Sequence, residues 1–428
     1  MIRLDTAAPG FAAAFDALVN DRREADADVS RDVAAIIGSV RREGDAALHA
    51  FTKKFDGHEL NDSGWRIERA GCEAALATLD ADLREALTLA RDRITSYHEK
   101  QRPADAEYAE DNGVVTGARW RGVDAAGLYV PGGRAAYPSS VLMNAIPARV
   151  AGVERLVIVT PTPNGEANPL VLAAAALVGA DEVWRVGGAQ AIAALAYGTD
   201  RIKPVDVICG PGNAWVAEAK RQLYGVVGID MVAGPSEIVV VADGANDPEW
   251  TAADLLSQSE HDPTSQSILF TDDAGFADAV ADAADRQIGT LSTAKVARAA
   301  WDANGAIVLV PSLEEAMPLV NRLAPEHLEL AVADPAPLFD RVRHAGSVFL
   351  GRHTPEAVGD YVAGPNHVLP TGRRARFASG LSVLDFMKRT SFLSLSQAGL
   401  AAIGPAAVRL AEAEGLPAHA RSVALRLS

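Results

Sequence analysis

The sequence is short of cysteine, aromatic residues and basic charge, and these shortages exclude several classes of protein. Only two cysteines, Cys72 and Cys209, occur in 428 residues, so neither a disulfide framework nor a cysteine-rich zinc site is expected. Aromatic residues make up 6 %, and 40 Lys and Arg stand against 56 Asp and Glu, a net charge of −16. Without a dense basic patch interleaved with aromatics, nucleic acid is not an expected partner.

Long hydrophobic runs are also missing. The longest, around residues 169–180, is too short to cross a bilayer, which takes about 18 uncharged apolar residues or more. The N-terminal segment carries Asp5 and Asp16 among its apolar residues and lacks a basic region followed by an apolar stretch. It therefore does not predict a signal peptide, and we expect a cytoplasmic protein without a membrane partner.

Apolar residues are nevertheless plentiful, because hydrophobic types make up 49 % of the chain and charged types 22 %. These fractions are typical of a globular protein. At roughly 100–200 residues per domain, the length predicts two to four domains, each able to bury a core.

Hydrophobic periodicity predicts a helical N-terminal part followed by two stretches of alternating strands and helices. Residues 15–110 have helical spacing, most clearly at 32–41 and 72–94, and a strand-like run follows at 117–121. Such alternation is typical of parallel α/β sheets. The expected strands are 156–160, 182–186, 205–209, 237–242, 267–271, 306–310 and 347–350. The expected helices are 170–178, 189–197, 214–224, 248–259, 275–288, 313–323 and a C-terminal region, 382–428.

Three glycine-rich runs lie in the first of these alternating stretches. Gly187-Gly188 and Gly210-Pro211-Gly212 each come between a strand and a helix, where helix N-terminal amides can hold an anion. Neither completes a G-x-G-x-x-G motif, so ordinary tight turns remain the alternative. A third run, 129–134, places an aromatic and a cation beside a flexible loop, a combination that suits a nucleotide.

Two pairs of residues could carry chemistry. Gln258 and His261 are three residues apart, on one face of the expected helix, and could be two metal ligands; a histidine near a helix C-terminus is the alternative. Glu326 and His327 place a carboxylate beside an imidazole, with Pro325 expected as the first residue of a helix. Neighbours on a helix diverge by about 100°, so the two would serve different atoms, as two proton removals require. An ordinary capped helix start is the alternative.

Further polar residues lie toward the C-terminus. Asp360 and His367 occupy a glycine-punctuated loop after the last expected strand, and parallel sheets commonly place their sites at the carboxyl ends of strands. Glu414 and His419 lie in the final segment, where the pattern alone assigns them no role. Cys209 ends an apolar strand, which favours a core residue over a reactive thiolate.

These segments together closely resemble the histidinol dehydrogenase family. The resemblance runs from about residue 30 to residue 422. It rests on motifs in the family's order: YVPGG, GGAQAIAAL, CGPGNAWVAEAKRQL, AGPSE, DLLSQSEH, APEHLEL, GDYVAGPNHVLPT and EGLPAH.

The resemblance implies an α/β fold of two incomplete Rossmann-like parallel-sheet domains, with small N- and C-terminal helical extensions, in an intertwined homodimer. The implied parts are an N-terminal extension, 1–25; a first α/β domain with the metal and catalytic residues, 26–126 plus 237–380; a second α/β domain on the NAD side, 127–236; and a C-terminal domain that reaches the partner subunit, 381–428.

The resemblance also implies ligands for particular residues. One zinc per subunit would be held by Gln258, His261, Asp360 and His419, a donor set that also suits manganese or cobalt. NAD would contact Tyr129, Gln190 and Asn213. The substrate would contact the four zinc ligands together with Ser236, His327 and Glu414, and His367 would lie near its carboxylate.

The implied activity is an NAD-dependent oxidation of L-histidinol to L-histidine through L-histidinaldehyde, at the end of histidine biosynthesis. This four-electron oxidation reduces two NAD, and zinc anchors the substrate. His327 would take the hydroxyl proton and assist the second oxidation, and Glu326 would activate water. One alternative is a related zinc- and NAD-dependent dehydrogenase acting on another polar alcohol, such as a sulfonated diol. Another is a metal-stabilised binding or scaffold protein without catalysis.

Overall fold

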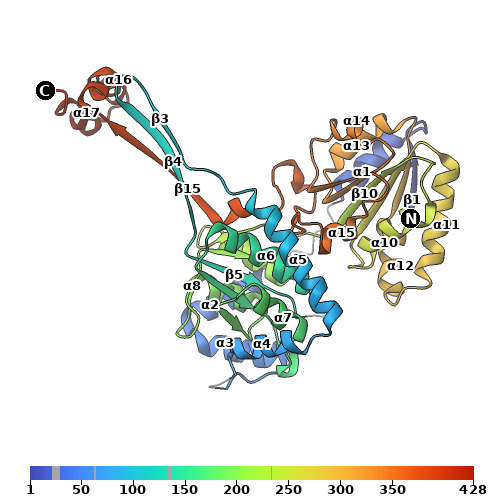
Figure 1. Cartoon of the computed structure of the whole chain (residues 1–428). Coiled ribbons are helices and arrows are strands. Elements are labelled where there is room, and N and C mark those ends of the chain that lie inside the picture. The colour runs from blue at the N-terminus through green and yellow to red at the C-terminus, as the bar shows by residue number, and fades with distance from the viewer. Residues whose placement is uncertain (22–28, 62–63, 133–136, 233) are drawn as a thin grey trace.

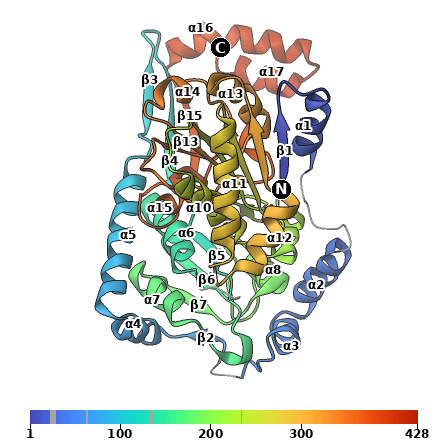
Figure 2. The same cartoon turned by 90° about the vertical axis from the view of Figure 1, so that its right-hand side faces the viewer.

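The computed structural model describes residues 1–21, 29–61, 64–132, 137–232 and 234–428. Within them, two six-stranded sheets each carry helices on both faces, and a three-stranded ribbon projects away from both (Figure 1). A view turned by 90° shows the helices of the first sheet facing the viewer (Figure 2). No helix among the described residues is long and apolar enough to cross a membrane.

The first sheet is parallel throughout. Val239 and Val241 point to the core on one face, while Ile238 and Val240 point to the core on the other, as the two-residue period of a strand requires. In spatial order its strands are β1 (Ile2–Asp5), β12 (Ala306–Leu309), β11 (Gln266–Thr271), β10 (Glu237–Ala242), β13 (His327–Ala331) and β14 (Ser347–Leu350). Its helices are α1 (Phe11–Asn20), α13 (Leu313–Leu323) and α14 (Ala336–Phe339) on one face, and α10 (Pro248–Ser259), α11 (Ala274–Ile288) and α12 (Ala294–Asn304) on the other.

The second sheet is parallel except at its β2 edge, where β2 pairs antiparallel with β7. In spatial order its strands are β2 (Arg66–Ile67), β7 (Glu182–Trp184), β6 (Arg155–Val159), β5 (Ala125–Tyr129), β8 (Val207–Cys209) and β9 (Gly228–Ile229). Its helices are α2 (Val29–Glu43), α3 (Asp45–Asp56), α8 (Gly188–Tyr197) and α9 (Ala214–Leu223) on one face, and α4 (Arg69–Thr78), α5 (Ala81–Glu99), α6 (Pro138–Ala151) and α7 (Pro169–Leu177) on the other.

The N-terminal helices pack on the second sheet, which corrects the expectation that residues 26–126 belong with residues 237–380. Helix α2 contacts α8 and α9, α4 contacts α7, and α5 contacts α6. Val33 and Ile36 enter one core of the second sheet and Ile94 the other. An amphipathic pattern predicts that a helix buries one face but not which sheet it covers.

Three further differences concern secondary structure. The expected helical extension at 1–25 begins with strand β1, which pairs with β12. The expected helical run at 72–94 is divided between α4 and α5, because Asp80 caps α5 by accepting a hydrogen bond from the Leu83 amide at 2.9 Å. Residues 382–428 contain a nine-residue strand, β15 (Met387–Leu395), before their helices.

The ribbon joins distant parts of the chain. Strand β15 pairs antiparallel with β4 (Val114–Gly122), which pairs with β3 (Ala106–Ala109). It carries α16 (Gln397–Ala413) and α17 (Pro417–Ala424) at its far end, well away from both sheets (Figure 1). We call the ribbon and these two helices the arm. Leu393, Leu410 and Leu425 on the arm are 61–64 % exposed, so much of its apolar surface is uncovered in the single chain.

Candidate active site

Glu326 and His327 lie where β13 begins, not in a helix as expected. Ala324 ends α13 in a left-handed conformation (φ 45°), and Pro325 follows it. The next residues alternate: Leu328 and Leu330 enter the core beneath α13, while His327 points to the opposite face. This two-residue period is the strand signal that the proline obscured. The two side chains lie close together, with His327 Nδ1 3.8 Å from Glu326 Oε2.

The backbone of Glu237, the first residue of β10, holds both side chains. Its amide donates to Glu326 Oε2 at 3.0 Å, and its carbonyl lies 3.0 Å from His327 Nδ1. A carbonyl only accepts, so this contact assigns the ring proton to Nδ1 of the neutral imidazole. Nε2 is then the basic atom, as general-base catalysis requires.

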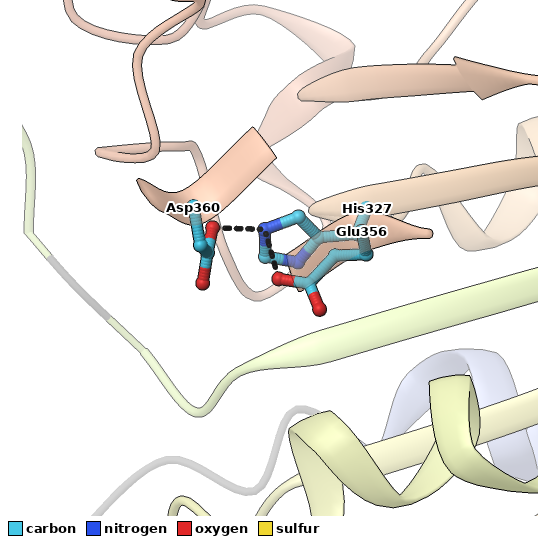
Figure 3. Close-up of side chains that lie close together, drawn as sticks. All are labelled: His327, Glu356 and Asp360. Carbon is cyan, nitrogen blue, oxygen red and sulfur yellow. Dashed lines mark ion pairs between the residues drawn. The ribbon is translucent and has the colours of Figure 1, made fainter. Parts of the chain in front are cut away.

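Two carboxylates from α15 (Glu356–Tyr361) face Nε2 of His327. Glu356 Oε1 lies 3.6 Å from it and Asp360 Oδ1 3.8 Å from it (Figure 3). Glu356 and Asp360 are four residues apart, so one face of the short helix presents both. In the described ranges these three residues are the His, Cys, Asp and Glu group that could hold a metal, with ligand atoms within 4.8 Å of one another.

Sequence reasoning missed Glu356. Its side chain is almost fully buried, and its Oε2 accepts a hydrogen bond from Ser257 Oγ at 2.9 Å. Its amide donates to Glu329 Oε1 at 2.7 Å. The four-residue spacing of two carboxylates before the GPNH motif was the signal that could have identified it.

The proton affinities of the cluster are strongly perturbed. Burial raises the pKa of Glu326 to about 8, against the lowering effect of His327. Burial alone would lower the pKa of His327, but the carboxylates of Glu326, Asp360 and Glu356 raise it to about 10. Burial likewise raises the pKa of Glu356 to about 7. Three carboxyl groups around one imidazole offer oxygen and nitrogen ligands to a cation, and a bound cation would favour the ionised carboxylates. A cation bound there would lower the pKa of His327 again, because like charges disfavour the imidazolium.

Gln258 and His261 come from the end of α10, which contacts α15. Gln258 is fully buried, and neither its Oε1 nor its Nε2 has a hydrogen-bond partner in the described part of the chain. An unsatisfied buried amide costs about 1–3 kcal/mol, so its retention points to a ligand. His261 follows α10 and lies within electrostatic range of Asp360 and His327.

His367 and Ser236 flank this cluster. His367 Nδ1 lies 2.9 Å from the Asp360 carbonyl, and its Nε2 lies 3.4 Å from Ser140 Oγ in α6. It therefore ties α15 to the helices of the second sheet. Ser236 precedes Glu237, and its carbonyl accepts a hydrogen bond from the Gln266 amide at 3.0 Å.

The cluster lies at the amino edge of the first sheet, which corrects the expectation of a site at the carboxyl ends of its strands. Glu237 and His327 are the first residues of β10 and β13. Helix α10 leaves the carboxyl end of β10 and runs back along the sheet, so its last turn delivers Gln258 to the amino edge. The sequence order of strand and site residue does not reveal this return.

The three expected NAD contacts lie at the carboxyl edge of the second sheet, around the glycine turns. Tyr129 ends β5, and its hydroxyl accepts a hydrogen bond from the Gly188 amide at 3.1 Å. Gln190 is buried in the first turn of α8. Asn213 caps α9, because its Oδ1 accepts from the amides of Trp215 and Val216 at 3.1 and 3.2 Å.

The glycine turn after β8 is sterically required. Gly210 has φ +112°, and a Cβ there would lie 2.2 Å from the Tyr129 carbonyl oxygen. In the third glycine run, Gly133 and Arg134 lie outside the described residues.

Cys209 is fully buried, and burial raises the pKa of its thiol well above the ordinary value. It is a core residue, since a neutral buried thiol is not a nucleophile.

Comparisons with known proteins agree over the whole chain. The family model described as histidinol dehydrogenase matches residues 19–427. Two curated relatives of that name, from Zymomonas mobilis and Rhodospirillum rubrum, are 63 % and 60 % identical over 428 residues, which is 100 % of this chain and 100 % and 99 % of theirs.

The chain belongs to the histidinol dehydrogenase family. A crystal structure of histidinol dehydrogenase from Elizabethkingia anophelis matches the fold with a TM-score of 0.95 at 36 % identity, over 100 % of this chain and 98 % of that one. The chain is accordingly an oxidoreductase of the final step of histidine biosynthesis, and the alternative of a scaffold without catalysis is wrong. Histidinol dehydrogenase activity implies NAD and zinc. The group of His327, Glu356 and Asp360 marks a place where a cation could bind, and it shares Asp360 with the expected zinc ligands Gln258, His261 and Asp360.

For a histidinol dehydrogenase, the structure of the single chain leaves two expected site residues apart from the rest. Glu414 and His419 are exposed and belong to the end of α16 and to α17. Figure 1 places those helices at the far end of the arm, away from α10 and α15. The chain by itself therefore brings together Gln258, His261, His327 and Asp360, but not its own Glu414 and His419.

Proposed function

We propose that this enzyme carries out the complete four-electron oxidation of L-histidinol to L-histidine, through L-histidinaldehyde, at the amino edge of the first sheet. Two hydrogen bonds support this most directly: the Glu237 amide donates to Glu326, and the Glu237 carbonyl accepts from His327 Nδ1. His327 Nε2 is thereby left facing α15. One basic atom and one carboxyl group, placed side by side, meet the needs of an alcohol oxidation followed by an aldehyde hydration and oxidation.

Zinc fits the residues at this edge. We propose that Gln258, His261 and Asp360 hold it, together with His419 of the partner subunit. Two imidazoles, one carboxylate and one amide oxygen are suitable donors, and the unsatisfied amide of Gln258 supplies the structural argument. Zinc bound by these residues would supply a template that orients the substrate, and NAD would supply the hydride acceptor for each of the two oxidations.

In this proposal the residues of the chain move the protons. His327 accepts the hydroxyl proton of the alcohol at Nε2, while the Glu237 carbonyl keeps Nδ1 protonated. Glu326 then removes a proton from the water that adds to the aldehyde. Its pKa of about 8, raised by burial, is suited to taking and releasing a proton near neutral pH. His327, after releasing its first proton to solvent, takes the hydroxyl proton of the hydrate in the second oxidation.

We further propose that Tyr129, Gln190 and Asn213 line the NAD site and that Ser236, Glu414 and His419 complete the substrate site. The arm supports an intertwined homodimer. Its two helices carry exposed Leu410 and Leu425 and lie far from the chain's own cluster, so a partner subunit would both cover the arm and receive Glu414 and His419.

The experiment is NADH formation from L-histidinol and NAD by the full-length protein, before and after metal removal and zinc restoration. Two NADH per histidinol, lost on chelation and recovered with zinc, are expected. Absence of turnover by the zinc-loaded protein would contradict the substrate assignment and would turn attention to other polar alcohols, such as sulfonated diols.

A further inference from the structure

A buried ion pair lies beside the Glu326–His327 pair. Arg373 Nη1 donates to Glu237 Oε1 at 2.9 Å, and both side chains are 2 % exposed. Arg373 Nη2 donates to Gln266 Oε1 at 2.7 Å in the neighbouring strand β11. The planar guanidinium therefore joins the starts of two adjacent strands through directed bonds.

The same guanidinium reaches the N-terminal part of the chain. Its Nη2 lies 3.2 Å from the Leu18 carbonyl, and its Nε lies 3.4 Å from the Val19 carbonyl. These carbonyls belong to the end of α1, whose orphan acceptors Arg373 satisfies. One arginine thus fixes β10, β11 and α1 relative to one another.

Arg373 takes an unfavourable backbone conformation to do so. Its φ is +66°, in the left-handed region that side-chain-bearing residues seldom adopt, directly after Gly372 at φ +61°. A buried ion pair is also costly to desolvate, and well-packed apolar residues would commonly give equal or greater stability. Arg373 therefore combines a strained backbone with a costly buried charge. Because backbone strain concentrates at functional sites, this combination indicates that Arg373 positions other groups.

We propose that Arg373 and Glu237 form a positioning pair that fixes the general base His327 and the carboxyl group of Glu326 through the backbone of Glu237. The Glu237 amide and carbonyl are the groups that hold those two side chains, and the Glu237 side chain is the part that Arg373 holds. Displacement of the first residue of β10 moves both reacting groups together. The inference rests on the proposed roles of Glu326 and His327.

The other end of β10 offers a comparison pair that is less buried, with side chains 26 % and 30 % exposed. Asp243 follows the strand, and Arg352 Nη2 lies 2.8 Å from both of its carboxylate oxygens. This second arginine–carboxylate pair stabilises the same sheet at the opposite edge, where it contacts none of the proposed reacting groups. Arg352→Met therefore reports the effect of losing an ion pair from β10 without a positional effect on the site.

The experiment uses the full-length, zinc-loaded enzyme and compares Arg373→Met, Glu237→Met/Arg373→Met and Arg373→Lys with Arg352→Met. Arg373→Met is expected to lower kcat about tenfold or more, because loss of alignment slows both oxidations, while KM for NAD and zinc content stay unchanged. The double variant removes both buried charges, so its thermal midpoint should return toward that of the wild type. Its kcat should stay about tenfold low. Arg373→Lys should have a kcat between those of Arg373→Met and the wild type. The lysine ammonium can pair with Glu237, but it lacks the planar guanidinium that bonds several acceptors at once.

A purely structural pair would behave differently. The proposal is overturned if the double variant regains stability and its kcat returns to the wild-type range, or if Arg352→Met lowers kcat as much as Arg373→Met. Failure of the proposed function is seen separately, as full activity in Glu326→Gln and His327→Asn. If Arg373→Met does not fold, the double variant and Arg373→Lys decide the question.

Discussion

His327 Nδ1 lies 3.0 Å from the backbone carbonyl of Glu237. This contact joins the first residues of two neighbouring parallel strands and sets the tautomer of the imidazole. The other ring nitrogen, Nε2, faces the carboxylates of Glu356 and Asp360.

Removing the two proposed proton acceptors should separate the two oxidations. His327→Asn should lower kcat with L-histidinol by about 10²–10⁴-fold, the usual contribution of a general base. Glu326→Gln should retain the alcohol step and stop at the aldehyde, giving one NADH per histidinol instead of two. Steady-state rates measure the fall in kcat, and single-turnover NADH yields measure the change in stoichiometry. The exposed Glu314 on α13 provides a control, since Glu314→Gln should behave as wild type.

Replacing Gln258 with an apolar residue should abolish zinc binding but should raise the stability of the metal-free protein. Gln258→Met removes an unsatisfied buried amide, so the metal-free protein should unfold about 1–3 kcal/mol less readily than metal-free wild type. The same variant should lose zinc and activity. Thermal unfolding with chelator and with zinc tests both effects. Gln222 is the matched control: its amide donates to the Ser30 carbonyl at 2.8 Å and to Glu218 at 2.7 Å, so Gln222→Met should destabilise. A lower metal-free stability for Gln258→Met would contradict a role as ligand.

Glu356→Gln should shift the pH dependence of activity to lower pH. The Glu356 carboxylate contributes to the raised pKa of His327, so its neutral analogue should lower that pKa. Because the proposed acceptor is the unprotonated imidazole, the rising acid side of the kcat profile should move to lower pH. Profiles for Glu356→Gln and for Glu315→Gln, an exposed site on α13, make the comparison. An unchanged profile in Glu356→Gln would show that this carboxylate does not face the working base.

Mixed dimers should test whether the arm completes the partner's site. Glu326→Gln and His419→Ala homodimers should each be inactive in the complete reaction. In a heterodimer, one site carries both defects and the other carries neither. Random 1:1 exchange should therefore restore about one quarter of wild-type activity, since about half the dimers have one intact site in two. Complete absence of recovery after verified subunit exchange would place His419 outside the partner's site.

Much of the fold was determined by local sequence patterns. The expected strands 237–242 and 347–350 and helices 248–259 and 313–323 coincide with β10, β14, α10 and α13, because each has an uninterrupted period of its own and a clear start or end. Strand β13 was missed because Pro325 resembles a helix start. The strand β15 was missed because its side chains are largely exposed, which weakens the apolar signal.

The sequence by itself therefore determined the class of fold, most of its strands and helices, and, through its motifs, the family. Only the tertiary structure decided which residues meet. It placed the N-terminal helices on the second sheet, returned Gln258 to the amino edge through α10, added Glu356 to the cluster and set Glu414 and His419 apart on the arm. Periodicity records which face of an element is buried, whereas the partner of that face is chosen by packing between segments distant in the chain.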